Sequence, residues 1–354
     1  NYRSTFISRT IMLKPLNLPI DAQIDSQTHW QTDLSQCITN IDELLAELKI
    51  NSSQLTSCQR AAAQFALRVP RPFVERMKKG DPNDPLLAQV LPVKSEMHLD
   101  PAYSKDPLDE SSHNPIAGIV HKYRHRLLLI VSPACAINCR YCFRRHFPYQ
   151  ENRQNKAQWQ QALDYISGNT DINEVIFSGG DPLAANDQFL GWLAEQIVAI
   201  PHVKRLRIHS RLPVVIPSRI DESFLRWATA SRLKPIMVLH INHSNEIDKE
   251  VAYAIERLLN AGIRVLNQTV LLKGVNDSAS TLAALSERLF DCAVTPYYLH
   301  LLDPVQGASH FDITPDQASQ IYRELQNTLP GFLLPKLVRE IPGELSKTII
   351  SSNI

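Results

Sequence analysis

Three cysteines stand within eight residues of one another, at Cys135, Cys139 and Cys142, directly after the apolar run 127–131. Thiolates are soft ligands, and three of them on one short loop are typical of an iron–sulfur site. A 4Fe–4S cluster held only by protein takes four cysteines. The chain's other three cysteines are scattered and share no such spacing. The loop therefore predicts a 4Fe–4S cluster with one iron open to a further ligand.

Two other uses of these thiols are weaker. A zinc site would need a fourth ligand, which His146 can offer, but zinc sites more often combine two CxxC pairs. A disulfide framework is typical of short secreted chains, whereas this chain has 354 residues and does not begin like a secretory signal peptide. Reduced, metal-binding thiols favour a cytoplasmic location.

The composition fits a large folded enzyme. Hydrophobic residues make up 44% of the chain, and the formal net charge is only +1, which argues against nucleic acid as a partner. No apolar run approaches the ~20 residues that span a bilayer, which argues against a membrane protein. Residues 1–11 contain basic and hydroxyl residues but no acid, which weakly resembles a transit peptide. We interpret them as an upstream tail.

Short apolar runs alternate with amphipathic segments from residue 126 onward. This alternation predicts an α/β fold with a buried parallel sheet, and about six units predict an incomplete (β/α)6-type barrel. Ligands of such a barrel gather at the carboxyl ends of its strands, which is where the cysteine loop falls. The expected strands are 127–131, 174–177, 203–209, 236–241, 263–272 and 294–301. The expected helices are 156–166, 188–200, 223–230, 245–260 and 281–290.

The chain divides into three parts on these patterns. Residues 1–118 are rich in short helical patterns and prolines, which predicts a tail followed by an N-terminal helical cap. The partial barrel is expected at 119–313, and a C-terminal segment at 314–354 completes the chain.

A glycine motif follows the second expected strand, in the run Ser178, Gly179, Gly180 and Asp181. Paired glycines let backbone amides approach a ligand closely, and a carboxylate beside them can accept a hydrogen bond from a cationic amino group. Alone, this turn is weak evidence, because most such turns only close a loop.

Together, the cysteine spacing and the glycine motif resemble radical S-adenosylmethionine enzymes. The spacing is C-x3-C-x2-C, with Tyr141 just before the last cysteine. The resemblance implies that the open iron binds S-adenosylmethionine and that its cleavage yields a 5′-deoxyadenosyl radical. It also places the glycine motif, His240 and Gln268 beside S-adenosylmethionine.

A more specific resemblance, over residues 68–348, is to the lysine 2,3-aminomutases. It includes the cysteine loop, the segments 80–87, 106–108, 121–126 and 242–246, and a Pro-Gly loop that ends in Lys347. The resemblance implies that the C-terminal segment binds pyridoxal 5′-phosphate, with Lys347 as its Schiff-base lysine. Arg126 and Lys122 would bind the cofactor phosphate, and Tyr123 would lie near its ring.

The same resemblance implies how the substrate L-lysine is held. Arg144 matches the arginine that binds the substrate carboxylate, and a planar guanidinium suits that role. Asp303 aligns with one of two aspartates that bind the ε-ammonium, and Glu340 stands where the family has the second. Residue Ile349 replaces a more usual proline after Lys347-Thr348.

Partners and alternatives follow from the resemblance as well. The run 143–149 resembles the bacterial aminomutases that make (R)-β-lysine for elongation factor P, which implies an external electron donor and a ligase related to lysyl-tRNA synthetase. A catabolic lysine 2,3-aminomutase, or an aminomutase for another amino acid such as glutamate, stays open. A non-enzymatic iron–sulfur electron carrier is the alternative from another class. The sequence leaves the oligomeric state open, a homo-oligomer included.

Overall fold

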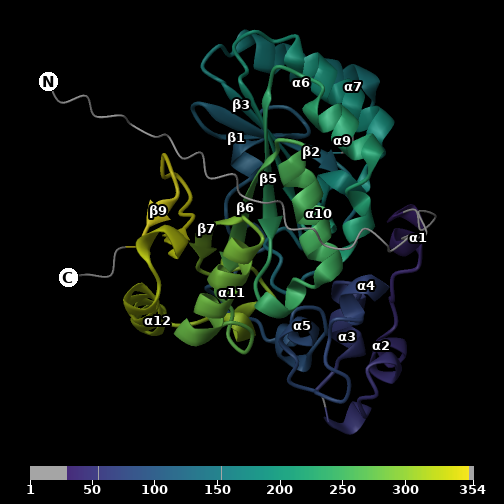
Figure 1. Ribbon diagram of the computed structural model, residues 1–354, viewed down its shortest axis with the longest axis vertical. Helices are drawn as coiled ribbons and strands as arrows, with labels where there is room; N and C mark the ends of the chain where they lie inside the picture. Colours follow the sequence, from purple (N-terminus) through teal and green to yellow (C-terminus); the bar gives the residue numbers. More distant parts are fainter. Residues whose placement is uncertain (1–29, 55, 153, 351–354) are drawn as a thin grey trace, which may run out of the picture.

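One nine-stranded sheet, in the strand order β1 to β9, organises the protein (Figure 1). The computed structural model describes residues 30–54, 56–152 and 154–350. The strands are β1 (Ile119–Tyr123), β2 (Arg126–Ser132), β3 (Glu174–Gly179), β4 (Arg205–Ser210), β5 (Lys234–His240), β6 (Arg264–Val270), β7 (Thr295–His300), β8 (Lys336–Arg339) and β9 (Thr348–Ile349). Strands β2 to β8 run parallel, while β1 and β9 are antiparallel edges. Because these two edges do not pair, the barrel is incomplete, as the sequence predicts.

The six parallel strands that the sequence predicts are confirmed, and the described residues add a seventh, β8, beyond them. All six expected strands are present as β2 to β7. The seventh, β8, pairs with β7 and has only four residues. Such a short run carries too little periodicity to be recognised from the sequence. The hairpin strand β1 and the edge strand β9 were missed as well.

Helices connect the parallel strands, and all of them except α8 begin at a side-chain cap. Their bounds are α6 (Lys156–Gly168), α7 (Asp187–Val198), α8 (Leu212–Val215), α9 (Glu222–Thr229), α10 (Lys249–Asn260), α11 (Ala279–Asp291) and α12 (Pro315–Thr328). The caps of α6, α7, α9, α10, α11 and α12 are Asn155, Asn186, Asp221, Asp248, Ser278 and Thr314. Each side chain accepts a backbone N–H that the first helical turn leaves unpaired. The helix expected at 245–260 begins later, at Lys249, after the 3-10 turn Ser244–Glu246.

Residues alternate between two faces of the sheet, which gives it a helix-covered side and an inner side. On β4, Leu206 and Ile208 are buried in the hydrophobic core shared with the helices. Arg207 and His209 alternate with them and are only partly buried. The side chains available for chemistry therefore lie on the inner face, by which we mean the face opposite the helices.

The region before β1 contains short helices, which lie together at one end of the molecule (Figure 1). They are α1 (Trp30–Ser35), α2 (Ile41–Glu47), α3 (Gln59–Gln64), α4 (Arg71–Val74) and α5 (Pro85–Ala88). Leu44, Phe73 and Leu87 from this region belong to the same hydrophobic core as Phe177 of β3. The three-part division of the chain stays a prediction.

Two sequence expectations concern the membrane and the start of the chain. In residues 30–350, apart from the two undescribed positions, no helix is long and apolar enough to cross a membrane. The tail at 1–11 lies outside the described residues.

A buried ion pair ties the cysteine loop to the region before β1. Arg140 donates from Nε and Nη2 to the two carboxylate oxygens of Glu96, at 2.9 and 2.6 Å. Both side chains are essentially excluded from water. Arg145 donates to the same carboxylate at 2.9 Å. Glu96 thus fixes two arginines of the loop.

Replacing Glu96 with Ala should destabilise the protein strongly, because two buried arginines would lose their carboxylate. Breaking a buried pair in this way costs about 3–5 kcal/mol. Glu43→Ala is the matched control, because its partner Arg71 is exposed, and an exposed pair is worth about 1 kcal/mol or less. Urea unfolding followed by circular dichroism measures both; equal losses in the two variants would contradict the role given to Glu96.

Candidate active site

The cysteine loop leaves the end of β2 and is anchored by backbone hydrogen bonds. Asn138 N donates to the carbonyl of Arg68 at 2.9 Å, and Arg140 N donates to that of Gln89 at 2.9 Å. The loop's conformation is therefore set by residues far from it in the sequence.

The three thiols of the loop lie near one another. Burial raises the pKa of Cys135, and the neighbouring Cys142 raises it further. Burial, followed by Cys139, raises the pKa of Cys142 to about 11. Buried thiols of this kind ionise only when a cation compensates the charge, and iron supplies that charge. This donor set fits a cluster.

A cluster and a single-ion site place different demands on their ligands. Across the described residues, no three His, Cys, Asp or Glu side chains gather tightly enough to hold one metal ion. The cysteines of a cluster bind different irons, so they need not meet at one point as the ligands of a single metal ion do.

The glycine motif packs directly against the cysteine loop. A Cβ on Gly179, whose φ is +126°, would lie 2.4 Å from the carbonyl oxygen of Ser132. A Cβ on Gly180 would lie 2.6 Å from the carbonyl oxygen of Ala134 and 2.9 Å from the sulfur of Cys135. Both positions require glycine, so part of this motif serves the close approach of two loops.

Asp181, expected to face a cationic amino group, is engaged within the protein. Its carboxylate accepts hydrogen bonds from Ser210 Oγ at 2.7 Å, Arg211 N at 2.8 Å, Leu212 N at 2.9 Å and Leu183 N at 3.0 Å. Burial raises the pKa of Asp181, against these hydrogen bonds, which lower it. Asp181 therefore joins the ends of β3 and β4.

Arg144 is held by a carboxylate that the sequence analysis did not single out. Its Nε and Nη2 each lie 2.7 Å from a carboxylate oxygen of Glu110. Its Nη1 donates to Ser178 Oγ at 2.9 Å and to the carbonyl of Gly179 at 3.1 Å. A guanidinium has five N–H donors, so one, on Nη2, is left for a ligand. The pair borders a surface pocket of about 420 Å³.

His240 and Gln268 lie side by side, because they are register partners on β5 and β6. His240 Nε2 is 2.9 Å from the hydroxyl of Tyr141, and the two rings are stacked. Burial, and then Arg211, lower the pKa of His240 well below its usual value. His240 is therefore neutral and lies beside the cysteine loop.

The second group of expected residues gathers around Glu340. Lys347 forms an ion pair with Glu340, whose other oxygen lies 2.9 Å from Lys122 Nζ. Lys122 also donates to the carbonyl of Leu108 at 2.6 Å. Burial would raise the pKa of Glu340, but the two lysines outweigh it and bring the pKa to about 2. Glu340 is thus ionised and shared by both lysines.

Asp303 lies within the electrostatic reach of this group. Burial raises its pKa to about 7, with Lys347 opposing and Glu340 adding to the increase. Lys122 and Glu110 act on it more weakly. Asp303 is therefore influenced most by the charges around Glu340 and less by the Glu110 that binds Arg144.

Tyr123 and Arg126 complete the second group. The guanidinium of Arg126 lies over the Tyr123 ring, 4.1 Å from its centroid. Burial raises the pKa of Tyr123, and Glu340 adds to the effect, which places the phenol beside Glu340. Lys122 and Tyr123 therefore lie beside Glu340, and Arg126 is joined to them through the Tyr123 ring.

Two histidines that were missed in the sequence lie at the two groups of residues described above, the Arg144–Glu110 pair and the group around Glu340. Burial lowers the pKa of His209, and Lys347 and Arg144 lower it further, so its ring is close to both groups. Burial, followed by Lys347, lowers the pKa of His300 to about 3. Both rings are neutral. Their places at the ends of β4 and β7 are the signal that could have identified them, because such ends carry the active sites of barrels.

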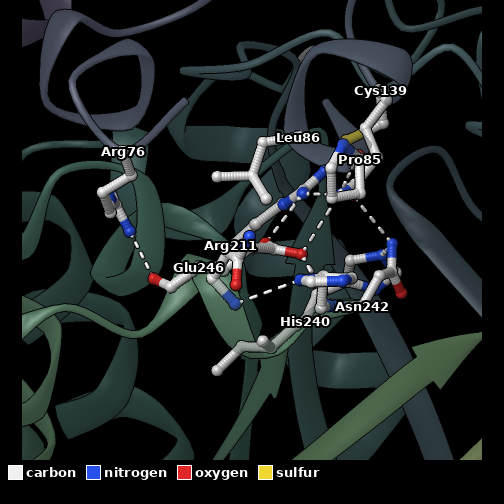
Figure 2. A network of polar contacts seen from close by, with 12 residues as sticks. Arg76, Pro85, Leu86, Cys139, Arg211, His240, Asn242 and Glu246 are labelled. Atoms are coloured by element: carbon white, nitrogen blue, oxygen red, sulfur yellow. Dashed lines mark hydrogen bonds and ion pairs between the residues drawn. The ribbon is translucent and has the colours of Figure 1, made fainter. Parts of the chain in front are cut away.

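Arg211, which follows β4, was missed as well. Figure 2 shows its guanidinium between Cys139, Glu246 and Asn242. Its distance from Cys139 in the sequence leaves no local signal for this contact.

Comparisons with known proteins agree with this geometry. The sequence matches the Radical SAM superfamily over residues 129–285. It is 53% identical over 324 residues to the L-lysine 2,3-aminomutase of Escherichia coli strain K12, covering 91% of this chain and 94% of that one. It is 50% identical to the L-lysine 2,3-aminomutase of Haemophilus influenzae, covering 94% and 98%.

A more distant relative is the L-lysine 2,3-aminomutase of Clostridium subterminale, at 30% identity over 92% of this chain and 78% of that one. The similarity thus extends well beyond the cysteine loop, over nearly the whole chain. The chain belongs to the L-lysine 2,3-aminomutase family of the radical SAM superfamily and is an isomerase.

Proposed function

We propose that this enzyme moves the amino group of L-lysine from Cα to Cβ and forms (R)-β-lysine. The observation that carries the proposal is the convergence of Lys347, Glu340 and Asp303 with Arg144 around the two neutral histidines His209 and His300. An amino acid with a cationic tail needs a cation for its carboxylate and acids for its ammonium, and this arrangement offers both.

The reaction explains the need for a cluster and S-adenosylmethionine. Together they supply a carbon radical that removes hydrogen from an unactivated carbon, which no side-chain base of ordinary pKa can do. Cys135, Cys139 and Cys142 would hold the cluster. Residues 178–181, His240 and Gln268 would line the S-adenosylmethionine site, where Gly179 and Gly180 give the close approach and Asp181 fixes the loop.

Pyridoxal phosphate would supply the carbonyl group that holds the migrating nitrogen. Lys347 would bind it covalently, and Lys122 and Arg126 would bind its phosphate, with Tyr123 against the ring. Glu340 would orient Lys347 Nζ through their ion pair, because its pKa of about 2 keeps the carboxylate ionised.

The substrate would lie between the two groups. Its carboxylate would take the free N–H of Arg144, which Glu110 holds in place, and its ε-ammonium would lie between Asp303 and Glu340. Two carboxylates there favour lysine over amino acids with acidic or apolar tails.

A role in elongation factor P modification is the finer part of the proposal. The run 143–149 supports this role by resemblance. The 53% identity of the chain to the Escherichia coli L-lysine 2,3-aminomutase is compatible with it. (R)-β-lysine would then pass to a ligase related to lysyl-tRNA synthetase, after an external electron donor has reduced the cluster. The reduced thiols fit a cytoplasmic enzyme.

Replacing Cys135, Cys139 or Cys142 with Ala should abolish cluster binding, because each thiolate would hold one iron. Cys37→Ala is the matched control, since Cys37 donates to the carbonyls of Asp33 and Ala136 and is no part of the ligand set. Iron and sulfide analysis after anaerobic reconstitution measures the result. A full cluster in Cys139→Ala would rule out this ligand set.

Borohydride should attach pyridoxal phosphate irreversibly to Lys347 and to no other lysine. Lys347→Ala should lose this labelling and the visible absorption of the bound cofactor, while keeping its iron content. Lys336→Ala, which changes a nearby exposed lysine, should be labelled normally. Peptide mapping that finds the label on Lys336 instead would show that the C-terminal loop has been misassigned.

Lysine binding should strengthen as the pH rises from 6 to 8. Asp303 has a pKa of about 7, so it is mostly neutral at pH 6 and mostly ionised at pH 8, and only the ionised form attracts the ammonium. Asp303→Asn should remove this dependence and lower kcat/KM for lysine by about 100-fold or more, since losing one partner of a buried pair costs about 3–5 kcal/mol.

Glu344→Gln serves as the control for this change, because Glu344 is an exposed acid in the loop before Lys347 and its substitution should leave kcat/KM unchanged. (R)-β-lysine formation is measured by chromatography across the pH range, and iron content and borohydride labelling of Asp303→Asn should match the wild type. Unchanged lysine turnover in Asp303→Asn would remove the reason for naming lysine as the substrate.

A further inference from the structure

Arg211 lies at the centre of a buried polar network that includes one cysteine of the loop (Figure 2). Its Nη1 donates to the sulfur of Cys139 and to the hydroxyl of Tyr141, both at 2.7 Å. Its Nη2 donates to Gln89 Oε1 at 2.7 Å and to Glu246 Oε2 at 3.0 Å. One guanidinium thus joins a cluster thiol, a carboxylate and the region before β1.

This guanidinium is fixed in place before any ligand binds. Arg211 N donates to the carboxylate of Asp181, which holds the backbone at the end of β4. Glu246 is held in turn, because its Oε1 accepts from the backbone N–H of Asn242 at 2.9 Å and of His243 at 3.1 Å. Arg211 is about 6% exposed and Glu246 is fully buried. The positive charge therefore cannot move away from Cys139 without breaking several hydrogen bonds.

The position of this charge matters for electron transfer to a cluster. Reduction adds one negative charge to the cluster and its thiolates. A hydrogen bond donated to a ligating sulfur, and a nearby fixed cation, stabilise that added charge and raise the reduction potential. Water is largely excluded from this network, so the effect is weakly screened.

We propose that Arg211 sets the reduction potential of the cluster through its hydrogen bond to Cys139, and that Glu246 limits this effect by partly neutralising the guanidinium. Arg211 is thus a positioning residue that acts through a cluster ligand. The inference rests on the cluster of the proposed function. The electron itself comes from a low-potential external donor and adds to the cluster without any bond being made or broken at Arg211.

Two substitutions should shift the potential in opposite directions. Arg211→Met removes the charge and all the N–H donors of the side chain at similar length, so the midpoint potential should become more negative than in the wild type. Glu246→Gln keeps an acceptor oxygen for Asn242 and His243 but removes the negative charge, so the potential should become more positive. Arg211→Lys keeps the charge and should lie between wild type and Arg211→Met.

The measurement is a redox titration of the full chain carrying its reconstituted cluster, without S-adenosylmethionine, followed by electron paramagnetic resonance. Arg219→Lys is the matched control: Arg219 is a fully buried arginine paired with Asp187, has no contact with the cysteine loop among its hydrogen bonds, and should leave the potential unchanged. If the substitutions at Arg211 and Glu246 only disturbed packing, the midpoint potential would shift in the same direction in both variants or would not shift.

The outcomes separate this inference from the proposed function. Opposite shifts in Arg211→Met and Glu246→Gln, with Arg219→Lys unchanged, support it. Wild-type potentials in both variants overturn it and leave the cluster proposal intact. If both Arg211 variants lose iron, the sign of the Glu246→Gln shift decides: a positive shift supports the inference, and no shift or a negative one overturns it. A wild-type chain that binds no four-iron cluster overturns the proposed function first.

Discussion

Buried arginine–carboxylate pairs hold the cysteine loop, and the rest of the site depends on them. Glu96 binds Arg140 and Arg145, Glu110 binds Arg144, and Glu246 binds Arg211. Pairs like these contribute little net stability, because desolvation offsets their attraction. Their value is in geometry: a guanidinium bound at two or more of its donors can face in only one direction. A loop that must present three thiols without regular secondary structure gains its shape from such contacts.

The buried arginine–carboxylate pairs also explain how charged residues can lie together on the inner face of an open sheet. Helices bury one side of β2 to β6 in one apolar core and residues of β7 and β8 in a second, which leaves the alternate residues for polar groups. On that face the charges nearly cancel: Lys122 and Lys347 surround Glu340, and Arg144 lies on Glu110. The neutral ring of His209 lies close to Lys347 and Arg144, and that of His300 lies close to Lys347 and Glu340, and neither ring adds charge. In the proposed function, this face would take up a cationic amino acid together with an anionic cofactor, whose charges are opposite.

The sequence predicts the parallel sheet well, because buried strands and capped amphipathic helices leave strong periodic signals. It misses β8, whose four residues are too few for a period. It also misses Glu110 and Arg211, whose partners lie 34 and 35 residues away in the chain. Such contacts are made only after folding and have no local pattern. Gly180 and Asp181 show a different limit. The resemblance implies that both lie at a ligand, but a sequence motif cannot show that Gly180 packs against the cysteine loop or that Asp181 binds the backbone of Arg211.

Glu340, which the sequence predicts to bind the substrate, forms ion pairs with other residues of the protein when no ligand is bound. Both of its oxygens are taken, one by Lys122 and one by Lys347. In the proposed function these two lysines are the residues that bind the cofactor, through its phosphate and its carbonyl group. Each lysine that the cofactor binds is then one that Glu340 loses, and a buried carboxylate without a cation is costly. In the proposed function, the ε-ammonium of lysine would supply that cation, so charge compensation at this one carboxylate would couple substrate binding to cofactor binding.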